Sequence, residues 1–352
     1  MSVILPPRGR GTGSNPLNRF APTTSVALDD GWFQEVPPSR ATEVRLETAK
    51  SIITRNQSPD LPFDRSVNPY RGCEHGCIYC YARPSHAYWD LSPGLDFETR
   101  LIAKTNAVAL LEQQLSRPGY QCAPINLGSN TDPYQPIERE HRLTRQTLEV
   151  LLRYRHPLTI VTKGSLVLRD LDLLTQLAEQ KLVKVLISLT TLDDELKRTL
   201  EPRAAAPSAR LRAIRVLREN RVPVGVLCSP MIPMINDMEL ESLLEAARDA
   251  GARQASYMLL RLPREVAPLF EEWLEAHYPQ RAAHVMSIIR QCRGGEVYDS
   301  RFGYRFRGQG PFAELLAQRF AVALRKLGLD RRMDQELDRS RFCPPGGQMA
   351  LL

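Results

Sequence analysis

The apolar residues of this chain gather into short runs that alternate with longer amphipathic segments between about residues 61 and 265. Five runs are apolar almost throughout, which is typical of strands covered on both faces in a parallel sheet. These runs cover residues 125–130, 158–163, 183–190, 222–229 and 255–260, and helical spacing occurs at 105–115, 143–154, 170–180, 208–220 and 237–251. For the last helix, Asp237 is the expected N-cap and Gly251 the expected C′ residue. The repeated strand–helix units predict parallel strands joined by right-handed crossovers.

A further strand is expected at about residues 65–70, which brings the number of units to about six. A closed eight-unit barrel of roughly 250 residues needs more units. The pattern therefore predicts an α/β fold that is either an open, partial barrel or a doubly wound sheet. In both architectures, ligands bind at the carboxyl ends of the strands. Polar residues follow four of the predicted strands at that end: Ser129, Asn130, Thr131, Asp132, Thr162, Lys163, Ser188, Thr190 and Ser229.

The regions on either side of these units differ from them in composition and pattern. Residues 1–60 are rich in Pro, Gly, Asn and Thr, which is typical of looped chain that wraps a core or stays mobile, and only residues 41–55 have a helical or strand-like rhythm. Residues 277–352 contain an amphipathic helix at about 312–327. We therefore divide the chain into a loop-rich N-terminal extension (1–60), a core (61–276) and a basic C-terminal extension (277–352).

Composition narrows the class of protein. The chain has 352 residues, of which 43% are hydrophobic and 25% charged, so it is neither disordered nor collagen-like. No apolar run reaches the roughly 18–20 residues of a membrane-spanning helix. The first residues break into Pro, Gly and Arg too early for a secretory signal. We therefore expect a soluble, cytoplasmic protein.

Most of the net charge of +7 lies in the C-terminal extension, which has 13 Lys/Arg against 7 Asp/Glu. A basic charge favours acidic partners such as nucleic acid. Arg301, Arg305 and Arg307 interleave with aromatic residues and are candidate phosphate contacts. The following helix, however, carries an apolar stripe that needs a partner surface; it consists of Phe312, Leu315, Leu316, Phe320 and Leu324. We favour a helix packed on the core over a nucleic-acid surface.

The seven cysteines are an odd number, and three of them, Cys73, Cys77 and Cys80, fall within eight residues, in the segment NPYRGCEHGCIYCYARP (68–84). This is a metal or redox pattern rather than a disulfide framework. Three thiolates leave one coordination position of a soft metal centre open. His75 or His86 could instead complete a structural zinc site. The corresponding alternative function is a nucleic-acid-binding protein with a structural zinc or iron–sulfur loop.

The C-x3-C-x2-C segment and the units that follow it resemble the radical SAM superfamily, over roughly residues 61–265. The resemblance implies a partial (β/α)6 barrel of the TIM type. It also implies that Cys73, Cys77 and Cys80 each ligate one iron of a [4Fe-4S] cluster, whose fourth iron binds S-adenosylmethionine (SAM). Tyr79, the aromatic residue before the last cysteine, would lie near the adenine.

Within the superfamily, the chain is most similar to the spore photoproduct lyase-like group. The similarity rests on CYA after the last cysteine, NTDPYQPIE after the second strand, a Thr-Lys pair after the third and SPMIP after the fifth. It implies that Tyr81, Thr131, Lys163, Ser188 and Ser229 contact the cofactor, with the Lys163 ammonium suited to the methionine carboxylate. Glu201 and Arg203 in LEPRAA follow the fourth strand and are candidates to reach the ribose, to close a loop or to form a simple salt bridge.

One residue departs from that group. Ser129 stands where the lyases carry a cysteine that donates a hydrogen atom, so repair of pyrimidine dimers is not expected. Cys228 and Cys122 are candidates for a relocated donor, although a lone cysteine is more often a small buried hydrophobe. The resemblance implies that an electron from a flavodoxin or ferredoxin cleaves SAM, and that a 5′-deoxyadenosyl radical then abstracts hydrogen from a substrate. No motif identifies that substrate.

Overall fold

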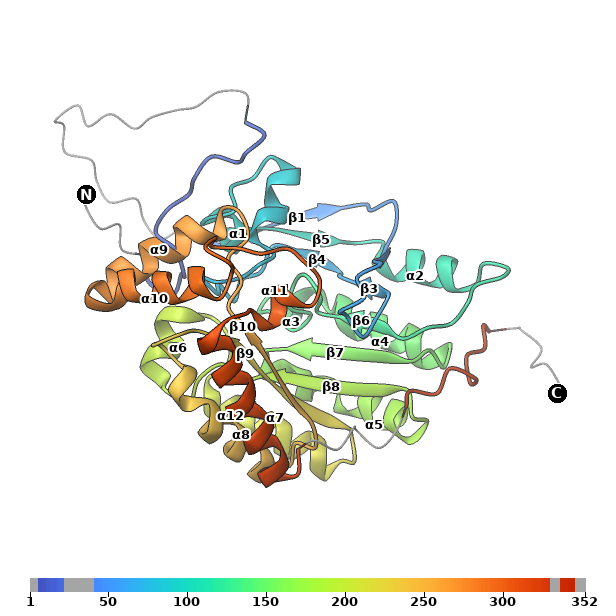
Figure 1. Cartoon of the computed structure of the whole chain (residues 1–352). Helices are drawn as coiled ribbons and strands as arrows, with labels where there is room; N and C mark the ends of the chain where they lie inside the picture. Colours follow the sequence, from blue (N-terminus) through green and yellow to red (C-terminus); the bar gives the residue numbers. More distant parts are fainter. Residues whose placement is uncertain (1–5, 22–40, 330–335, 346–352) are drawn as a thin grey trace.

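The computed structural model describes residues 6–21, 41–329 and 336–345. Its centre is a seven-stranded sheet in the order β10-β9-β8-β7-β6-β3-β2 (Figure 1). The strands are β2 (Ile53–Arg55), β3 (Arg65–Val67), β6 (Ile125–Leu127), β7 (Leu158–Thr162), β8 (Val183–Ser188), β9 (Val224–Met231) and β10 (Ala255–Leu259). All neighbours are parallel except β2, which pairs antiparallel with β3 at one edge. The six parallel strands confirm the predicted partial barrel.

Helices cover the outer face of this sheet and connect successive strands (Figure 1). The five predicted helices are confirmed as α2 (Ala107–Leu115), α4 (Leu143–Arg153), α5 (Leu171–Glu179), α7 (Pro207–Glu219) and α8 (Leu240–Asp249). Short turns of helix complete the connections: η1 (Arg83–Trp89), α1 (Asp96–Thr99), α3 (Glu138–His141), η2 (Ser165–Asp170), α6 (Asp194–Leu200) and η3 (Asp237–Glu239). The main hydrophobic core lies between these helices and the sheet.

The two faces of the strands differ more than the sequence predicts. In β8, Val183, Val185 and Ile187 pack into the core, whereas the alternate residues Lys184, Leu186 and Ser188 line a cavity. Alternation follows from the pleat of a strand. The expectation that both faces are packed is therefore wrong for β8, because the inner face of the partial barrel encloses open space.

The start of α8 also differs from the prediction. Glu239, rather than Asp237, is the N-cap of this helix, because η3 precedes it. The Asp237 carboxylate instead accepts a hydrogen bond from the backbone N–H of Met234 (2.6 Å). Gly251 lies just beyond the helix with φ +107°, a conformation that favours glycine, as expected of its C′ residue.

A second, three-stranded sheet lies beside the barrel and has the order β1-β5-β4. It consists of β1 (Glu43–Glu47), β4 (Tyr70–Arg71) and β5 (Arg100–Lys104). The single strand expected at 65–70 is thus two strands, β3 and β4, in different sheets. The break falls at Asn68 and Pro69, where proline has no N–H for a ladder.

The C-terminal extension packs on the barrel. Helix α9 (Val266–His277) ends at the first residue of the extension. The helices within the extension are α10 (Pro279–Gln291), α11 (Tyr304–Arg307) and α12 (Pro311–Leu327). Helix α12 packs against α8 and β10, where the Phe320 and Tyr257 ring centroids are 4.7 Å apart. Of the predicted apolar stripe, Leu315 is exposed and the other four residues pack on the core. In the part of the chain that the structure describes, no helix combines the length and apolar character needed to cross a membrane.

Candidate functional site

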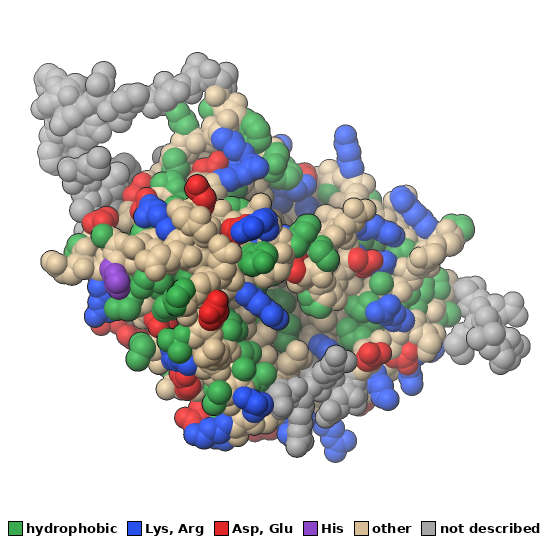
Figure 2. All heavy atoms as spheres, viewed as in Figure 1, with side chains coloured by type: hydrophobic (Ala, Val, Ile, Leu, Met, Phe, Trp, Pro, Cys, Tyr) green, Lys and Arg blue, Asp and Glu red, His purple; other side chains and the backbone are tan. Residues whose placement is uncertain are grey.

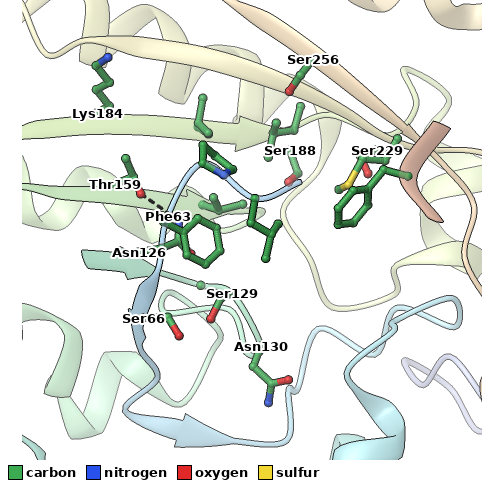
Figure 3. A pocket seen from close by; sticks show the side chains of 18 of the residues that line it. Phe63, Ser66, Asn126, Ser129, Asn130, Thr159, Lys184, Ser188, Ser229 and Ser256 are labelled. Atoms are coloured by element: carbon green, nitrogen blue, oxygen red, sulfur yellow. Dashed lines mark hydrogen bonds between the residues drawn. The ribbon is translucent and has the colours of Figure 1, made fainter. Parts of the chain in front are cut away.

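A cavity of about 1850 Å³ fills the inside of the partial barrel and reaches the carboxyl ends of its strands. Most of the side chains labelled in Figure 3 are small and polar, and they surround Phe63, which enters from the loop before β3. They are Ser66, Asn126, Ser129, Asn130, Thr159, Ser188, Ser229 and Ser256, with Lys184 further along. At the carboxyl end, Tyr79, Tyr81 and Lys163 also line the cavity. The interior is therefore wide and polar enough for a ligand.

The cysteine loop lies between β4 and η1, next to this end of the cavity. Its turns are made by Gly72 (φ +71°) and Gly76 (φ +69°), conformations that favour glycine. The backbone N–H of Cys73 donates to the carbonyl of Phe97 (2.9 Å), and that of Cys80 donates to Cys77 (3.2 Å). Backbone hydrogen bonds therefore fix the loop.

The three cysteines of the loop lie near one another, and Cys73 and Cys77 are buried while Cys80 is partly buried. Burial raises the pKa of all three, to about 12 for Cys77, and the neighbouring Cys77 and Cys80 further raise that of Cys73. The positive charge of Lys163 lowers the pKa of Cys77 and Cys80 and so partly offsets the effect of burial. Buried thiols of this kind ionise when they coordinate a metal centre. The donor set therefore fits a group that binds three thiolates.

Neither histidine of the zinc alternative is directed to the thiols as a fourth ligand. The His75 ring lies 3.4 Å from Asp132, and His86 contacts the carbonyl of Arg100 (3.0 Å) and packs on Phe97. Among the described residues, no group of three or more His, Cys, Asp or Glu is arranged around a single metal ion. The geometry does not support the zinc site.

Tyr79 and Lys163 lie near Cys77, beside a buried charge network centred on Glu201. Glu201, which is fully buried, accepts hydrogen bonds from the Tyr79 hydroxyl and from Thr190 (2.7 Å) and forms an ion pair with Arg210. Burial alone would raise the pKa of Glu201, but Arg210, Lys163 and these hydrogen bonds lower it to about 2. The Lys163 ammonium lies 5.7 Å from the centre of the Tyr79 ring. Glu201 therefore orients the Tyr79 ring, and its charge acts on Lys163. Arg203, predicted to act beside Glu201, pairs with Glu74 instead (2.8 Å).

The other predicted cofactor contacts fall into two groups. Tyr81, Ser188 and Ser229 line the cavity, and the Tyr81 hydroxyl donates to the backbone carbonyl of Ser129. Thr131, in contrast, is buried away from the cavity lining, and its hydroxyl donates to the carbonyl of Tyr70 (3.2 Å). Thr131 therefore supports the loop rather than facing the cavity.

The two candidate hydrogen donors do not line the cavity. Cys228 lies in the hydrophobic core with no exposed surface, and burial alone raises its pKa to about 12. Its neighbours on β9, Leu227 and Ser229, line the cavity, and Cys228 points to the other face. Cys122 precedes β6, outside the lining. These placements favour a packing role for Cys228, while Ser129 remains at the cavity wall.

Sequence reasoning missed Asn68 and Arg210. The Asn68 side-chain oxygen accepts hydrogen bonds from the backbone of Asn130 (3.1 Å) and Thr131 (3.4 Å), and its amide donates to the Ser129 hydroxyl (3.2 Å). It therefore joins the end of β3 to the end of β6. Asn68 could have been found as the polar residue that ends the first strand, whereas Arg210, on an amphipathic helix, gives no such signal.

Of the three arginines proposed as phosphate contacts, Arg301 and Arg305 are in ion pairs, whereas Arg307 lines the cavity. Arg305 forms a two-bond ion pair with Asp60, and Arg301 pairs with Asp299. Lys and Arg side chains are spread over the face in Figure 2 and interspersed with acidic ones rather than gathered into one patch. Among the described residues, these placements favour the packed helix over a nucleic-acid surface.

Comparisons with known proteins identify the family of this chain. The model of the Radical SAM superfamily matches residues 67–247, just over half of the chain. An uncharacterized protein of Mycobacterium tuberculosis is 38% identical over 233 residues, which cover 66% of this chain and 68% of that protein. Another, from Methanocaldococcus jannaschii, is 28% identical over 232 residues, or 66% and 82% of the two chains.

Solved structures show a similar fold. A mutant of spore photoproduct lyase has a TM-score of 0.59 at 14% identity and covers 85% of this chain and 86% of its own. The same lyase complexed with a dinucleoside spore photoproduct has a TM-score of 0.56 at 13% identity, over 81% and 79% of the two chains. At these identities the likeness extends to the fold alone.

Proposed function

This chain belongs to the radical SAM superfamily, and on that premise we propose that the cysteine loop and the adjoining end of the barrel cavity form its active site. The protein is a radical SAM enzyme, and membership of the family implies SAM and a [4Fe-4S] cluster. The observation that carries the proposal is that three neighbouring cysteines, two buried and one partly buried, lie next to a cavity lined by Lys163, Tyr79 and Tyr81.

In this proposal, Cys73, Cys77 and Cys80 hold the cluster. When bound and reduced, the cluster supplies the electron that splits SAM into methionine and a 5′-deoxyadenosyl radical, which abstracts hydrogen from the substrate. The substrate itself is not identified by the site.

The protein's own contribution is binding and orientation. Lys163 donates charge-assisted hydrogen bonds to the methionine carboxylate. Tyr79, Tyr81, Ser188 and Ser229 supply the wall against which SAM binds. The barrel around them restricts the access of water, which protects a reactive intermediate.

The electron donor that we propose is a reduced flavodoxin or ferredoxin, because the reaction needs one electron at low potential. Such a donor fits a cytoplasmic location. We propose Thr131 as a positioning residue for the loop, since its hydroxyl binds the carbonyl of Tyr70.

Anaerobic reconstitution with iron and sulfide tests the proposal. The protein should bind about four irons per chain and, once reduced, release methionine and 5′-deoxyadenosine from SAM. Cys73→Ala, Cys77→Ala and Cys80→Ala should each abolish release, whereas Cys343→Ala, outside the loop, should not. Stoichiometric zinc without sulfide after reconstitution, or SAM cleavage that survives the loop substitutions, would contradict the proposal.

A further inference from the structure

Arg261 stands at the carboxyl end of β10 and lines the cavity near the cysteine loop. Its guanidinium carbon lies 5.1 Å from the ring centre of Tyr81, the residue after Cys80, and 4.9 Å and 5.8 Å from those of Phe306 and Tyr298. The rings come from the cysteine loop and the C-terminal extension. Aromatic faces therefore surround and orient the guanidinium beside the proposed active site.

This cation has no acidic partner among the described residues. Other arginines near the site are paired: Arg210 with Glu201, and Arg305 with Asp60. For Arg261 the structure gives one hydrogen bond, from Nη2 to the Tyr298 hydroxyl (3.3 Å), and its buried Nε has no partner. A guanidinium has five N–H donors, so most of its capacity remains unused.

The positive charge is reinforced by Arg293. This side chain is buried and donates to the carbonyls of Leu259 (3.3 Å) and Leu260 (2.6 Å), the residues just before Arg261. Its Nε, too, is buried without a hydrogen-bond partner. The negative charge of Asp299 favours the charged form of Arg293 and raises its pKa. Asp299 is, however, already in an ion pair with Arg301 (2.7 Å). The local charge is therefore left for a ligand to compensate.

We propose that Arg261 is a substrate-binding residue that takes an oxyanion, a phosphate or a carboxylate, of the molecule on which this enzyme acts. The planar fork of a guanidinium matches both groups. This inference rests on the proposed function, because it places the anion beside Tyr81 and hence beside the cysteine loop. The methionine carboxylate of SAM is assigned to Lys163, which lies over the other tyrosine, Tyr79.

Three small probes separate the ligand chemistries: phenyl phosphate, benzoate and neutral phenol. Their binding is measured by anaerobic calorimetry on the oxidised, SAM-bound holoenzyme. We expect at least one anion to bind saturably and phenol to bind far more weakly. Tighter binding of phenyl phosphate identifies a phosphate subsite, and tighter binding of benzoate identifies a carboxylate subsite. Absence of saturable binding of both anions, or phenol binding as tightly as they do, overturns the inference.

Substitutions of Arg261 test whether the anion binds at this residue. Arg261→Gln should raise the dissociation constant of the better anion by about ten- to a hundredfold, the range for a charge-assisted hydrogen bond. Arg261→Lys should raise it less, because it keeps the charge and loses the fork. Arg264→Gln, at an exposed arginine three residues further on, is the matched control and should leave it unchanged. Unchanged affinity in Arg261→Gln refutes the assignment.

A measurement on the unaltered protein covers the case in which the variants do not fold. Bound anion should protect Arg261 from phenylglyoxal, as read by peptide mass spectrometry, while Arg264 stays reactive. Equal modification of Arg261 with and without saturating anion overturns the inference. SAM cleavage by the same preparation reports on the proposed function separately. Cleavage without anion binding rejects the subsite alone, and absent cleavage rejects the proposed function.

Discussion

Gly11 lies where the N-terminal segment crosses the outside of the cysteine loop, and Gly11→Ala should damage both stability and cluster binding. A Cβ built on Gly11 would lie 1.8 Å from the backbone oxygen of Gly76, which is part of the loop. The backbone N–H of Gly11 also donates to the carboxylate of Glu98 (2.9 Å). Glu98 is fully buried and pairs with Arg83 (2.6 Å), whose guanidinium donates to the carbonyls of Gly76 and Cys77.

The magnitude follows from this geometry. Ordinary contact begins at 3.4 Å, so the N-terminal segment or Gly76 must move by roughly 1.5 Å. Overpacking of this kind costs about 1–3 kcal/mol, and a lost hydrogen bond to a buried carboxylate costs about 1.5–3 kcal/mol. Because one displacement causes both losses, they do not add fully, and we expect about 3 kcal/mol. If Gly76 moves, Cys77 moves with it.

The assay compares Gly11→Ala with Gly9→Ala. Gly9 has φ +76° and nothing within 4 Å of its added Cβ, so Gly9→Ala costs only the backbone strain of about 1–2 kcal/mol. Iron retained after reconstitution and gel filtration, SAM cleavage and the free energy of unfolding are measured for both. Gly11→Ala should lose more iron and more stability than Gly9→Ala. Equal iron retention and equal stability in the two variants would refute the argument that the N-terminal segment supports the loop.

Three further predictions address the charged groups. Lys163→Ala should keep its iron but bind SAM about ten- to a hundredfold more weakly in anaerobic calorimetry, with exposed Lys50→Ala as control; unchanged affinity would remove Lys163 from the site. Glu201→Gln should destabilise the protein near neutral pH, as measured by denaturant titration. Because the pKa of Glu201 falls from 4.5 to about 2 on folding, the stability that its charge contributes is present above pH 4.5 and is lost as the pH falls toward 2. The difference between the two proteins should therefore shrink over that window, and a constant difference would show that the charge is not its cause. Arg305→Ala should lower the melting temperature through loss of its ion pair with Asp60, with little change in any salt-dependent binding to duplex DNA; a log-log salt slope reduced by about 0.9 at unchanged melting temperature would indicate a phosphate contact.

The sequence alone determined the parts of this protein that depend on local pattern. The apolar runs at 158–163 and 183–190 identify β7 and β8 because short runs rich in β-branched and aliphatic residues favour strands. The spacing of Cys73, Cys77 and Cys80 identifies the loop because ligands to one centre must lie close along the chain. Polar residues such as Lys163 mark the carboxyl ends of the strands for the same local reason. The apolar stripe of the C-terminal extension predicted helix α12, because apolar residues at helical spacing form one face of a helix.

Tertiary structure decided whatever depends on contacts between distant segments. Glu201 pairs with Arg210 and accepts a hydrogen bond from Tyr79, which is 122 residues away, and so orients the ring near which Lys163 lies. The separation of β3 from β4 depends on which partner strands are available across space, since neither segment has a distinctive period of its own. Cys228 and Ser229 are adjacent in sequence, but the pleat of β9 sends one into the core and the other to the cavity. Arg261 acquires its three aromatic neighbours only when the C-terminal extension folds back on the barrel, because no sequence period links residues so far apart.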